Sequence, residues 1–240
     1  MIFRQFLHRD PIAASYLLGC GGHGVCAVVD PLEDGEPYVR AAAESGMKIR
    51  YVIDTHVHAD HVSGGRRLAQ QAGAQYVLHA SVAHDSALGV DERDQLVLGN
   101  VVLLVLHTPG HTPEHICLLV SDRTRDETPW LILTGHTLMV GDMGRTELAA
   151  SAEEGAAALY ATAARLRALP DHVEVWPGAF SGSVCGRALS GKPSSTIGFE
   201  RRFNRAFRLD NRDEFIATML RDIPVPPPHA TETRAANLAA

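Results

Sequence analysis

The sequence predicts a layered α/β fold in which mixed β-sheets are covered by helices. Short apolar segments rich in β-branched residues recur between residues 2 and 178, bounded by glycine, proline or polar residues. Segments with helical spacing fall between blocks of strands and do not alternate strictly with single strands. This order favours mixed sheets over strictly alternating strand-helix units. An apolar content of 45% over 240 residues is sufficient for the core that such layers require.

The expected elements follow from local patterns along the chain. Strands are expected at 2–7, 14–19, 25–30, 51–54, 74–79, 115–120, 129–136 and 173–178, with a further pair around the Gly-Asn turn within 96–107. Helices are expected at 37–46, 63–72, 151–169 and near 212–221. We therefore expect one main domain over residues 1–190 and an extension over residues 191–240 that wraps the domain and ends loosely.

Charge and composition exclude several classes of protein. A formal net charge of −6 argues against a broad nucleic-acid surface, because phosphate binding is driven by clustered positive charge. No apolar run reaches the roughly 18 residues that indicate a membrane-spanning helix. The four scattered cysteines form no CxxC pair, and no signal-peptide pattern opens the sequence. A reducing compartment, the cytoplasm, is therefore expected.

Histidine is concentrated between residues 56 and 136, which hold nine of the 13 copies. The segment HVHADH places four polar side chains directly after an apolar strand: His56, His58, Asp60 and His61. A loop at a strand end can fold such side chains toward one point. Imidazole and carboxylate are ligands for borderline divalent metals, so this segment predicts a metal site.

Two later strands also end in histidine. In HTPGHTPEH the Pro-Gly turn is expected to lift His111 out of the sheet and make it a ligand, while His107 and His115 are interpreted as loop or supporting histidines. The strand WLILTGHT ends at His136, directly after Gly135. Three strand ends therefore offer histidine.

With these motifs the chain resembles the metallo-β-lactamase superfamily, whose signature HxHxDH stands here as HVHADH. The segments HTPGHT, TGHTLMVGDMGRTEL and VEVWPGAFSG are most similar to its glyoxalase II and persulfide dioxygenase branch, including bacterial metal-binding domains that occur alone or fused to rhodanese modules. The resemblance covers roughly residues 1–210. It implies an αββα sandwich with the metal at one edge between the two sheets.

The resemblance also implies which positions hold metal, and two of them depart from the family's pattern. Matching positions in this chain are His56, His58, His111, Asp60 and His61. A bridging aspartate of the family is replaced by His136, and a late histidine by Ala179. A carboxylate can bridge two cations, whereas a neutral imidazole binds one and adds no charge. A stable dinuclear centre is therefore not expected.

The favoured ligand set is His56, His111 and His136, because the resembling persulfide dioxygenases hold one iron at the corresponding positions. One divalent metal is expected, with iron(II) favoured and zinc(II) as the alternative, since zinc also accepts three imidazoles. His58 and His61 are expected close to the metal. Asp60 is the candidate general base, because a carboxylate close to a metal-bound water can accept its proton.

Other residues give weaker signals. Arg145 matches a GRT segment that lies beside the glutathione site in the resembling dioxygenases, so it is a candidate substrate-binding residue; a surface arginine is the alternative. Cys185 is interpreted as a small buried apolar group, with a persulfide-accepting thiol as the alternative. Phenylalanine and arginine interleave over 199–208, which predicts a helix with one apolar face, although a site for an anionic thiol carrier is conceivable.

Three functional hypotheses follow from the motifs and the resemblance. The first is an enzyme of sulfur metabolism that oxidises a glutathione-type persulfide to sulfite at a mononuclear iron. The second is a zinc-dependent thioester hydrolase similar to glyoxalase II, and the third is a noncatalytic thiol-binding or metal-binding protein with an altered site. The expected partners are a small thiol or persulfide and, as further options, a separate rhodanese-type protein or a second copy of the chain; nucleic acid and membrane are not expected.

Overall fold

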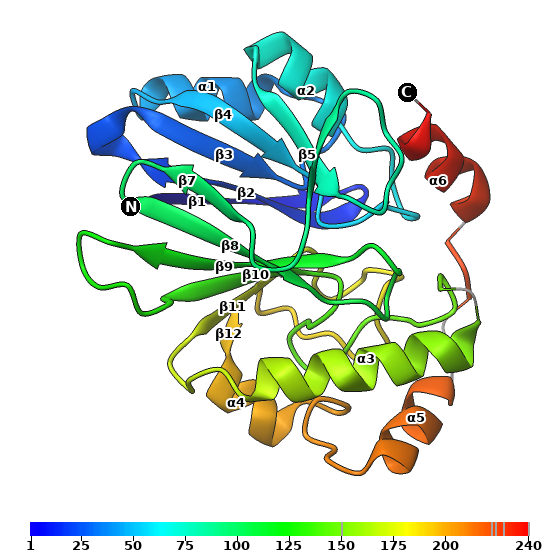
Figure 1. Ribbon diagram of the computed structural model, residues 1–240. Coiled ribbons are helices and arrows are strands. Elements are labelled where there is room, and N and C mark those ends of the chain that lie inside the picture. The colour runs from blue at the N-terminus through cyan, green and yellow to red at the C-terminus, as the bar shows by residue number, and fades with distance from the viewer. Residues whose placement is uncertain (150, 222, 224, 228, 240) are drawn as a thin grey trace.

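Two mixed six-stranded sheets lie face to face in the molecule (Figure 1). The computed structural model describes residues 1–149, 151–221, 223, 225–227 and 229–239. The first sheet has the order β1 (Ile2–Arg9), β2 (Ile12–Cys20), β3 (Val25–Val29), β4 (Lys48–Ile53), β5 (Gln75–His79) and β6 (Ala87–Val90). The second has the order β12 (Ser195–Thr196), β11 (Glu174–Pro177), β10 (Leu131–Gly135), β9 (Ile116–Asp122), β8 (Val101–His107) and β7 (Gln95–Leu98).

Helices cover the outer face of each sheet, which completes four layers (Figure 1). The first sheet carries α1 (Glu36–Glu44) and α2 (Gly65–Ala72), and the second carries α3 (Ala152–Arg167), α4 (Ile197–Phe203) and α5 (Arg212–Leu220). A short helix, η1 (Gly21–His23), links β2 to β3, and α6 (Ala230–Leu238) follows at the C-terminus. No helix among the described residues is both long enough and apolar enough to span a lipid bilayer. The αββα sandwich implied by the resemblance is confirmed.

The core divides into three layers because successive strand residues point to opposite faces of a sheet. In β2, Tyr16 and Leu18 belong to the apolar cluster between the two sheets, whereas Leu17 packs with Tyr38 of α1 on the other side. A third cluster lies between the second sheet and α3, where Leu159 is fully buried. All four cysteines are buried and free.

The strand directions bring three loops to one edge of the sandwich. β8 and β10 are both antiparallel to β9, so they run in the same direction and end at the same side of the second sheet. β4 is parallel to β3 and β5 in the first sheet, and the loop that follows it joins β9 through the hydrogen bond from Ile116 N–H to the Thr55 carbonyl. The loops after β4, β8 and β10 are those that carry the predicted ligands.

The structure differs from the sequence prediction in a few elements. β6 and the two-residue β12 were not predicted, because neither has a clear apolar alternation of its own. A loose end was predicted after residue 222, but Ala230–Leu238 forms a helix; residues 222, 224, 228 and 240 lie outside the described part. Because β12 belongs to the second sheet, the first residues of the predicted extension are part of the sandwich itself. The domain boundary at residue 190 stays a prediction.

Candidate metal centre

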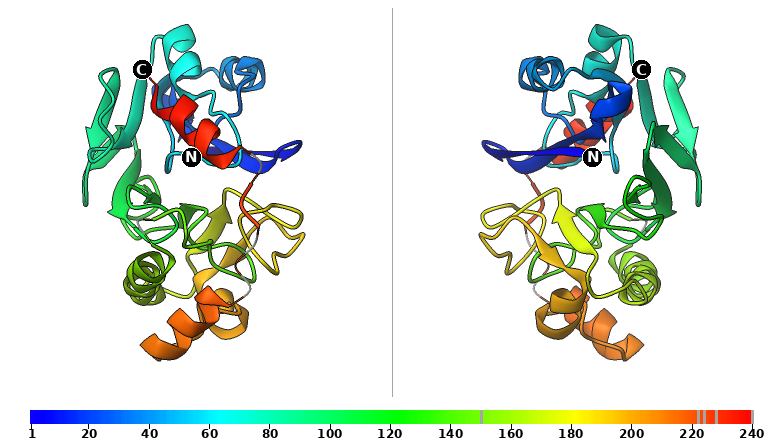
Figure 2. Two further views of the ribbon diagram at one scale, coloured as in Figure 1. Left: turned by 90° about the vertical axis from the view of Figure 1, so that its right-hand side faces the viewer. Right: turned by 90° about the vertical axis from the view of Figure 1, so that its left-hand side faces the viewer.

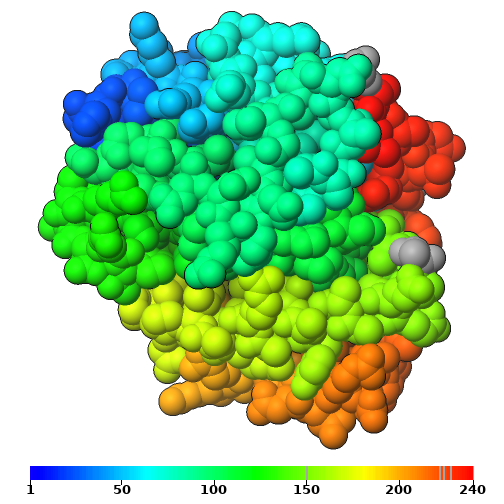
Figure 3. Space-filling view, in the orientation of Figure 1, coloured from blue at the N-terminus to red at the C-terminus, as the bar shows by residue number. Residues whose placement is uncertain are grey.

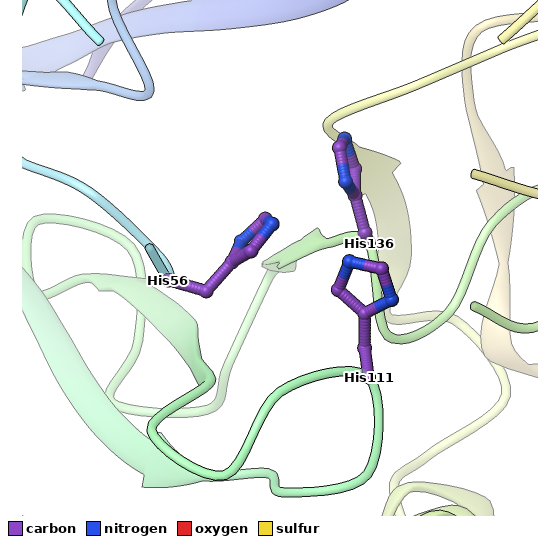
Figure 4. Close-up of side chains that lie close together, drawn as sticks. All are labelled: His56, His111 and His136. Carbon is purple, nitrogen blue, oxygen red and sulfur yellow. The ribbon is translucent and has the colours of Figure 1, made fainter. Parts of the chain in front are cut away.

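Three histidines from three loops point toward one space (Figure 4). His56 follows β4, His111 follows β8 and His136 follows β10 directly after Gly135. Their ring centroids lie 4.9 Å (His56 to His111), 4.8 Å (His56 to His136) and 5.3 Å (His111 to His136) apart. One nitrogen from each ring lies within 4.8 Å of the others, and all three side chains are buried. The structure thus brings the three favoured ligands together.

Hydrogen bonds fix which nitrogen of His56 carries the proton. The Thr55 hydroxyl donates to Oδ2 of Asp30 at 2.9 Å, so its oxygen accepts from Nδ1 of His56 at 2.9 Å. Nε2 of His56 is therefore the unprotonated nitrogen, and it is buried with no hydrogen-bond partner in the part of the chain that the structure describes. A chain from a carboxylate through a hydroxyl to an imidazole orients a metal ligand in this way.

The imidazole rings of His111 and His136 are also held in the neutral form that can bind a metal. Nδ1 of His111 donates to the backbone carbonyl of Arg145 at 3.0 Å, which leaves Nε2 with its lone pair. Both ring nitrogens of His136 are buried, and no described residue forms a hydrogen bond with either of them. Burial, with the neighbouring imidazoles, holds the pKa of His56 and of His111 well below the ordinary value, and burial also lowers the pKa of His136. Metal binding requires this neutral form.

A second group of charged side chains adjoins the three histidines. His58, Asp60 and His136 also offer ligand atoms within 4.8 Å of one another. Nδ1 of His61 lies 3.2 Å from Oδ1 of Asp60, and Nε2 of His58 lies 3.2 Å from Oδ1 of Asp30. His58 thus lies beside the three-histidine group, with Asp60 between it and His61. That His58 and His61 adjoin a metal stays a prediction.

The charges of this second group support one another. Burial opposes a charge on His58, but the carboxylates of Asp30 and Asp60 outweigh it and raise the pKa of His58 well above its ordinary value. Burial likewise opposes ionisation of Asp60, yet His61 and His136 hold the pKa of the Asp60 carboxyl well below its ordinary value. The Asp60 carboxyl is therefore held in its ionised form next to the histidines.

His115 supports the ligands and is not placed to bind the metal. Its ring is stacked on His56 at 5.0 Å between centroids, and its Nε2 accepts from the backbone N–H of His136 at 3.2 Å. Its Nδ1 consequently donates to the hydroxyl of Thr108 at 2.9 Å, so both ring nitrogens are used. His107 lies further out, stacked on His79 at 4.2 Å. The supporting role considered for His115 fits these contacts.

Several residues that hold the site carried no motif in the sequence. Asp30 is buried and accepts from the backbone N–H and the hydroxyl of Thr55 at 2.7 and 2.9 Å. Glu114 accepts from the backbone N–H of Val57 at 3.0 Å. The one signal that could have identified Asp30 is its place at the end of the predicted strand 25–30, a polar residue directly after a buried apolar run.

The residues with weaker signals are deeply buried. Arg145 has no exposed surface; its guanidinium pairs with Glu147 and donates to the backbone carbonyls of Val184 and Val225 at 3.0 and 3.2 Å. A surface arginine, the alternative interpretation, does not describe it, while its substrate-binding role stays a prediction. Cys185 is buried, and burial raises the pKa of its thiol well above the ordinary value, which fits the apolar interpretation.

Two other parts of the predicted site are Ala179, which stands where the family has a histidine, and the phenylalanine-rich segment 199–208. Ala179 is buried in a small apolar cluster with Met139 and Cys185, so no ligand atom reaches the site from this position. Of the three phenylalanines in the segment 199–208, only Phe207 enters the core, whereas Phe199 and Phe203 stack on each other at 4.7 Å and are 53% and 66% exposed. The predicted apolar helix face is therefore only partly covered.

Gly135 lets β10 turn sharply into His136. Its φ is +46°, and a Cβ there would lie 2.6 Å from both Nε2 of His115 and Oγ1 of Thr55. We expect Gly135→Ala to lower the free energy of unfolding by about 2 kcal/mol or more, since left-handed backbone alone costs about 1–2 kcal/mol for a residue with a Cβ. The matched control is Gly73→Ala, where φ is +61° and the space is open. Equal losses for the two variants in urea unfolding would contradict the expected clash.

The residues present fit a divalent cation. Three neutral imidazoles converge, and the buried nitrogens His56 Nε2, His136 Nδ1 and His136 Nε2 have no hydrogen-bond partner among the described residues. Buried polar atoms are nearly always satisfied, so an unsatisfied set that converges indicates a bound group. Histidine nitrogens suit zinc and iron(II) alike.

Comparison with known proteins gives one family and two kinds of relative. The sequence profile of the metallo-beta-lactamase superfamily matches residues 9–210. A hydroxyacylglutathione hydrolase from Nitrosococcus oceani is 30% identical over 225 residues, which cover 82% of this chain and 81% of that protein. The mitochondrial persulfide dioxygenase ETHE1 of Mus musculus is 27% identical over 223 residues, which cover 91% of this chain and 80% of that protein.

A solved structure is similar over nearly the full length of both chains. The crystal structure of ETHE1 from Myxococcus xanthus has a TM-score of 0.87 and 29% sequence identity, and the match covers 100% of this chain and 99% of that one. Together with the geometry, these similarities agree with the branch that the motifs indicated.

Proposed function

The chain belongs to the metallo-β-lactamase superfamily and has a divalent-metal site of that fold, and we propose that it oxidises a low-molecular-weight persulfide of the glutathione type to sulfite. Persulfide, dioxygen and water would give the free thiol and sulfite. The observation that carries the proposal is the convergence of the imidazoles of His56, His111 and His136. These are the positions that the resemblance to persulfide dioxygenases implies for one iron.

The chain's own residues would divide the work as follows. His56, His111 and His136 would hold the metal through nitrogens that are already unprotonated or free of partners. A bound iron(II) supplies redox chemistry with dioxygen, whereas zinc supplies only a Lewis acid. Asp60 would be the proton acceptor of the site, because its carboxylate offers an oxygen within 4.8 Å of ligand nitrogens of His58 and His136.

The substrate would approach this group from the side of Asp60. A hollow of about 160 Å³ opens beside Asp60. Its walls are formed by Pro11, Ile12, Gly182, Ser183, Val184 and Pro227. The small volume suits the reacting end of a thiol carrier, and the remainder of the carrier would lie outside it. Arg145, buried behind Val184, would bind that carrier only after exchanging its present contacts.

Oxygen consumption tests the proposal directly. Purified protein is loaded with iron(II) and mixed with glutathione persulfide, and both dioxygen uptake and sulfite are measured. We expect equal amounts of sulfite formed and dioxygen consumed, with none above background for metal-free protein. Protein that holds iron yet consumes no dioxygen would overturn the proposal.

A zinc-dependent thioester hydrolase is the second candidate. The similarity to a hydroxyacylglutathione hydrolase and the complete HVHADH segment favour it. In that case Asp60 would accept a proton from the attacking water. Cleavage of S-lactoylglutathione by zinc-loaded protein distinguishes this candidate from the first.

Exchanging His136 for aspartate tests whether the third imidazole is a working ligand. We expect His136→Asp to lower iron-dependent dioxygen uptake at least tenfold, because the shorter side chain withdraws from the space and places a second carboxylate beside Asp60. The matched control is His172→Asp at an exposed position. An increase in uptake would mean that histidine at position 136 impairs the site.

The remaining expectations concern partners and place in the cell. A cytoplasmic location, association with a separate rhodanese-type protein, a second copy of the chain as partner and a noncatalytic role all stay predictions.

A further inference from the structure

The C-terminal segment runs from the helices that cover the second sheet back to the candidate metal centre. After α5, Pro227 forms part of the wall of the hollow beside Asp60. The chain then ends in α6, which lies on the side of the first sheet (Figures 2 and 3). The profile of the superfamily matches only to residue 210, so α6 lies beyond it. The segment is anchored at its start as well, because the guanidinium of Arg145 donates to the carbonyl of Val225.

The loop that α6 contacts has little support of its own. Residues 56–62 contain four of the predicted site residues, yet none of these seven residues shares a backbone–backbone hydrogen bond with any other residue that the structure describes. A loop without such bonds is free to shift unless side chains fix it. Here the side chains come from distant parts of the chain.

Asn237 of α6 bonds three backbone groups of this loop and its end. Its Nδ2 donates to the carbonyls of His58 and His61, each at 2.9 Å. Its Oδ1 accepts from the backbone N–H of Ser63 at 2.9 Å. The half-buried side-chain amide of Asn237 therefore links the backbone of the loop from His58 to Ser63.

Arg234, one turn earlier in α6, fixes the start of the same loop. Its guanidinium donates to the carbonyl of Val57 at 2.9 Å and lies 3.7 Å from Oε1 of Glu114. That carboxylate in turn accepts from the backbone N–H of Val57. Val57, which stands between the histidines at 56 and 58, is thus held on both its backbone groups.

We propose that α6 is a clamp on the metal-binding loop and that Asn237 is its positioning residue, which sets how His58, Asp60 and His61 face the metal. Asn237 touches no ligand atom and acts only through the backbone. The inference rests on the proposed function in one respect, namely that a metal occupies the site. It is independent of whether the reaction is oxidation or hydrolysis.

The test uses the full chain with two changes at one position and one control. Asn237→Ala removes the bonds, and Asn237→Asp keeps the shape and the acceptor while removing both donors. Thr231→Ala, at an exposed position of the same helix, is the matched control. The probe is cobalt(II), whose visible absorption reports the geometry of its ligands, and its dissociation constant is measured by competition with a chelator.

We expect both Asn237 variants to bind cobalt(II) about 10–100-fold more weakly than the wild type and to show shifted absorption bands, as loss of an outer orienting group typically does. Thr231→Ala should match the wild type in both measurements. If Asn237→Asp restores the wild-type values, or if neither variant changes them, the clamp is overturned. If the wild type itself binds no cobalt(II), the metal site of the proposed function fails.

A measurement without metal keeps the clamp testable on its own. In metal-free protein, hydrogen exchange of the Ser63 amide should become faster by at least tenfold in Asn237→Ala, because its acceptor is lost. Amides of β9, remote from α6, should exchange at unchanged rates, which shows that the variant remains folded. Unchanged exchange at Ser63 would overturn the inference even if metal affinity falls.

Discussion

Replacing His111 with alanine is expected to remove the bound metal and with it the activity. His111 offers an unprotonated Nε2 in a buried group of three imidazoles, and its loss leaves only His56 and His136 of that group. Mutating a residue that only orients a ligand typically lowers metal affinity or activity by about 10–100-fold. Removing a ligand itself should therefore lower both metal affinity and activity by more than about 100-fold. Elemental analysis after purification and dioxygen uptake with added iron(II) are the two measurements.

A matched substitution separates this effect from damage to the fold. His107→Ala removes an imidazole from the same segment, four residues earlier, where the ring stacks on His79 outside the metal group. This variant should retain the wild-type metal content and activity within about twofold. The prediction for His111 would be wrong if the alanine variant kept a full equivalent of metal.

Asp30 should have the largest effect on stability. Its buried carboxylate accepts from Thr55 twice and pairs with Nε2 of His58. Removing one partner of a buried ion pair costs about 3–5 kcal/mol, because the other partner stays buried without compensation. We expect Asp30→Ala to lower the free energy of unfolding of the metal-free protein by that amount, measured by urea unfolding.

Asp30→Asn provides the comparison that isolates the charge. Position 30 has φ of +49°, a conformation that asparagine tolerates about as well as aspartate. Asparagine also keeps one acceptor for the Thr55 backbone N–H, so its cost should be roughly half that of alanine. An alanine variant that unfolds within about 1 kcal/mol of the wild type would contradict the role given to this carboxylate.

The sequence pattern predicts the layers, and it also predicts the histidines that the structure brings together. HVHADH is compact, and His111 and His136 each follow a strand that is apolar throughout, so local pattern was enough to predict them. The order of strand blocks and helices likewise predicted the layers, and the family resemblance supplied their arrangement.

The supporting groups could not be predicted, because their partners are far apart along the chain. Asp30 meets Thr55 across 25 residues, Glu114 meets Val57 across 57, and Asn237 meets His58 across 179. Single polar residues of this kind have no periodicity and no fixed spacing. Their role emerges only when the layers have placed the three strand ends at one edge.

The three histidines of the candidate metal centre come from the two halves of the chain that form the two sheets. Residues 2–90 form the first sheet and residues 95–196 the second, and no strand is shared between them. His56 belongs to the first of these halves, and His111 and His136 belong to the second. A cation at this edge is therefore a cross-link between the halves of the chain, and its binding energy adds to the cohesion of the sandwich as well as to its chemistry.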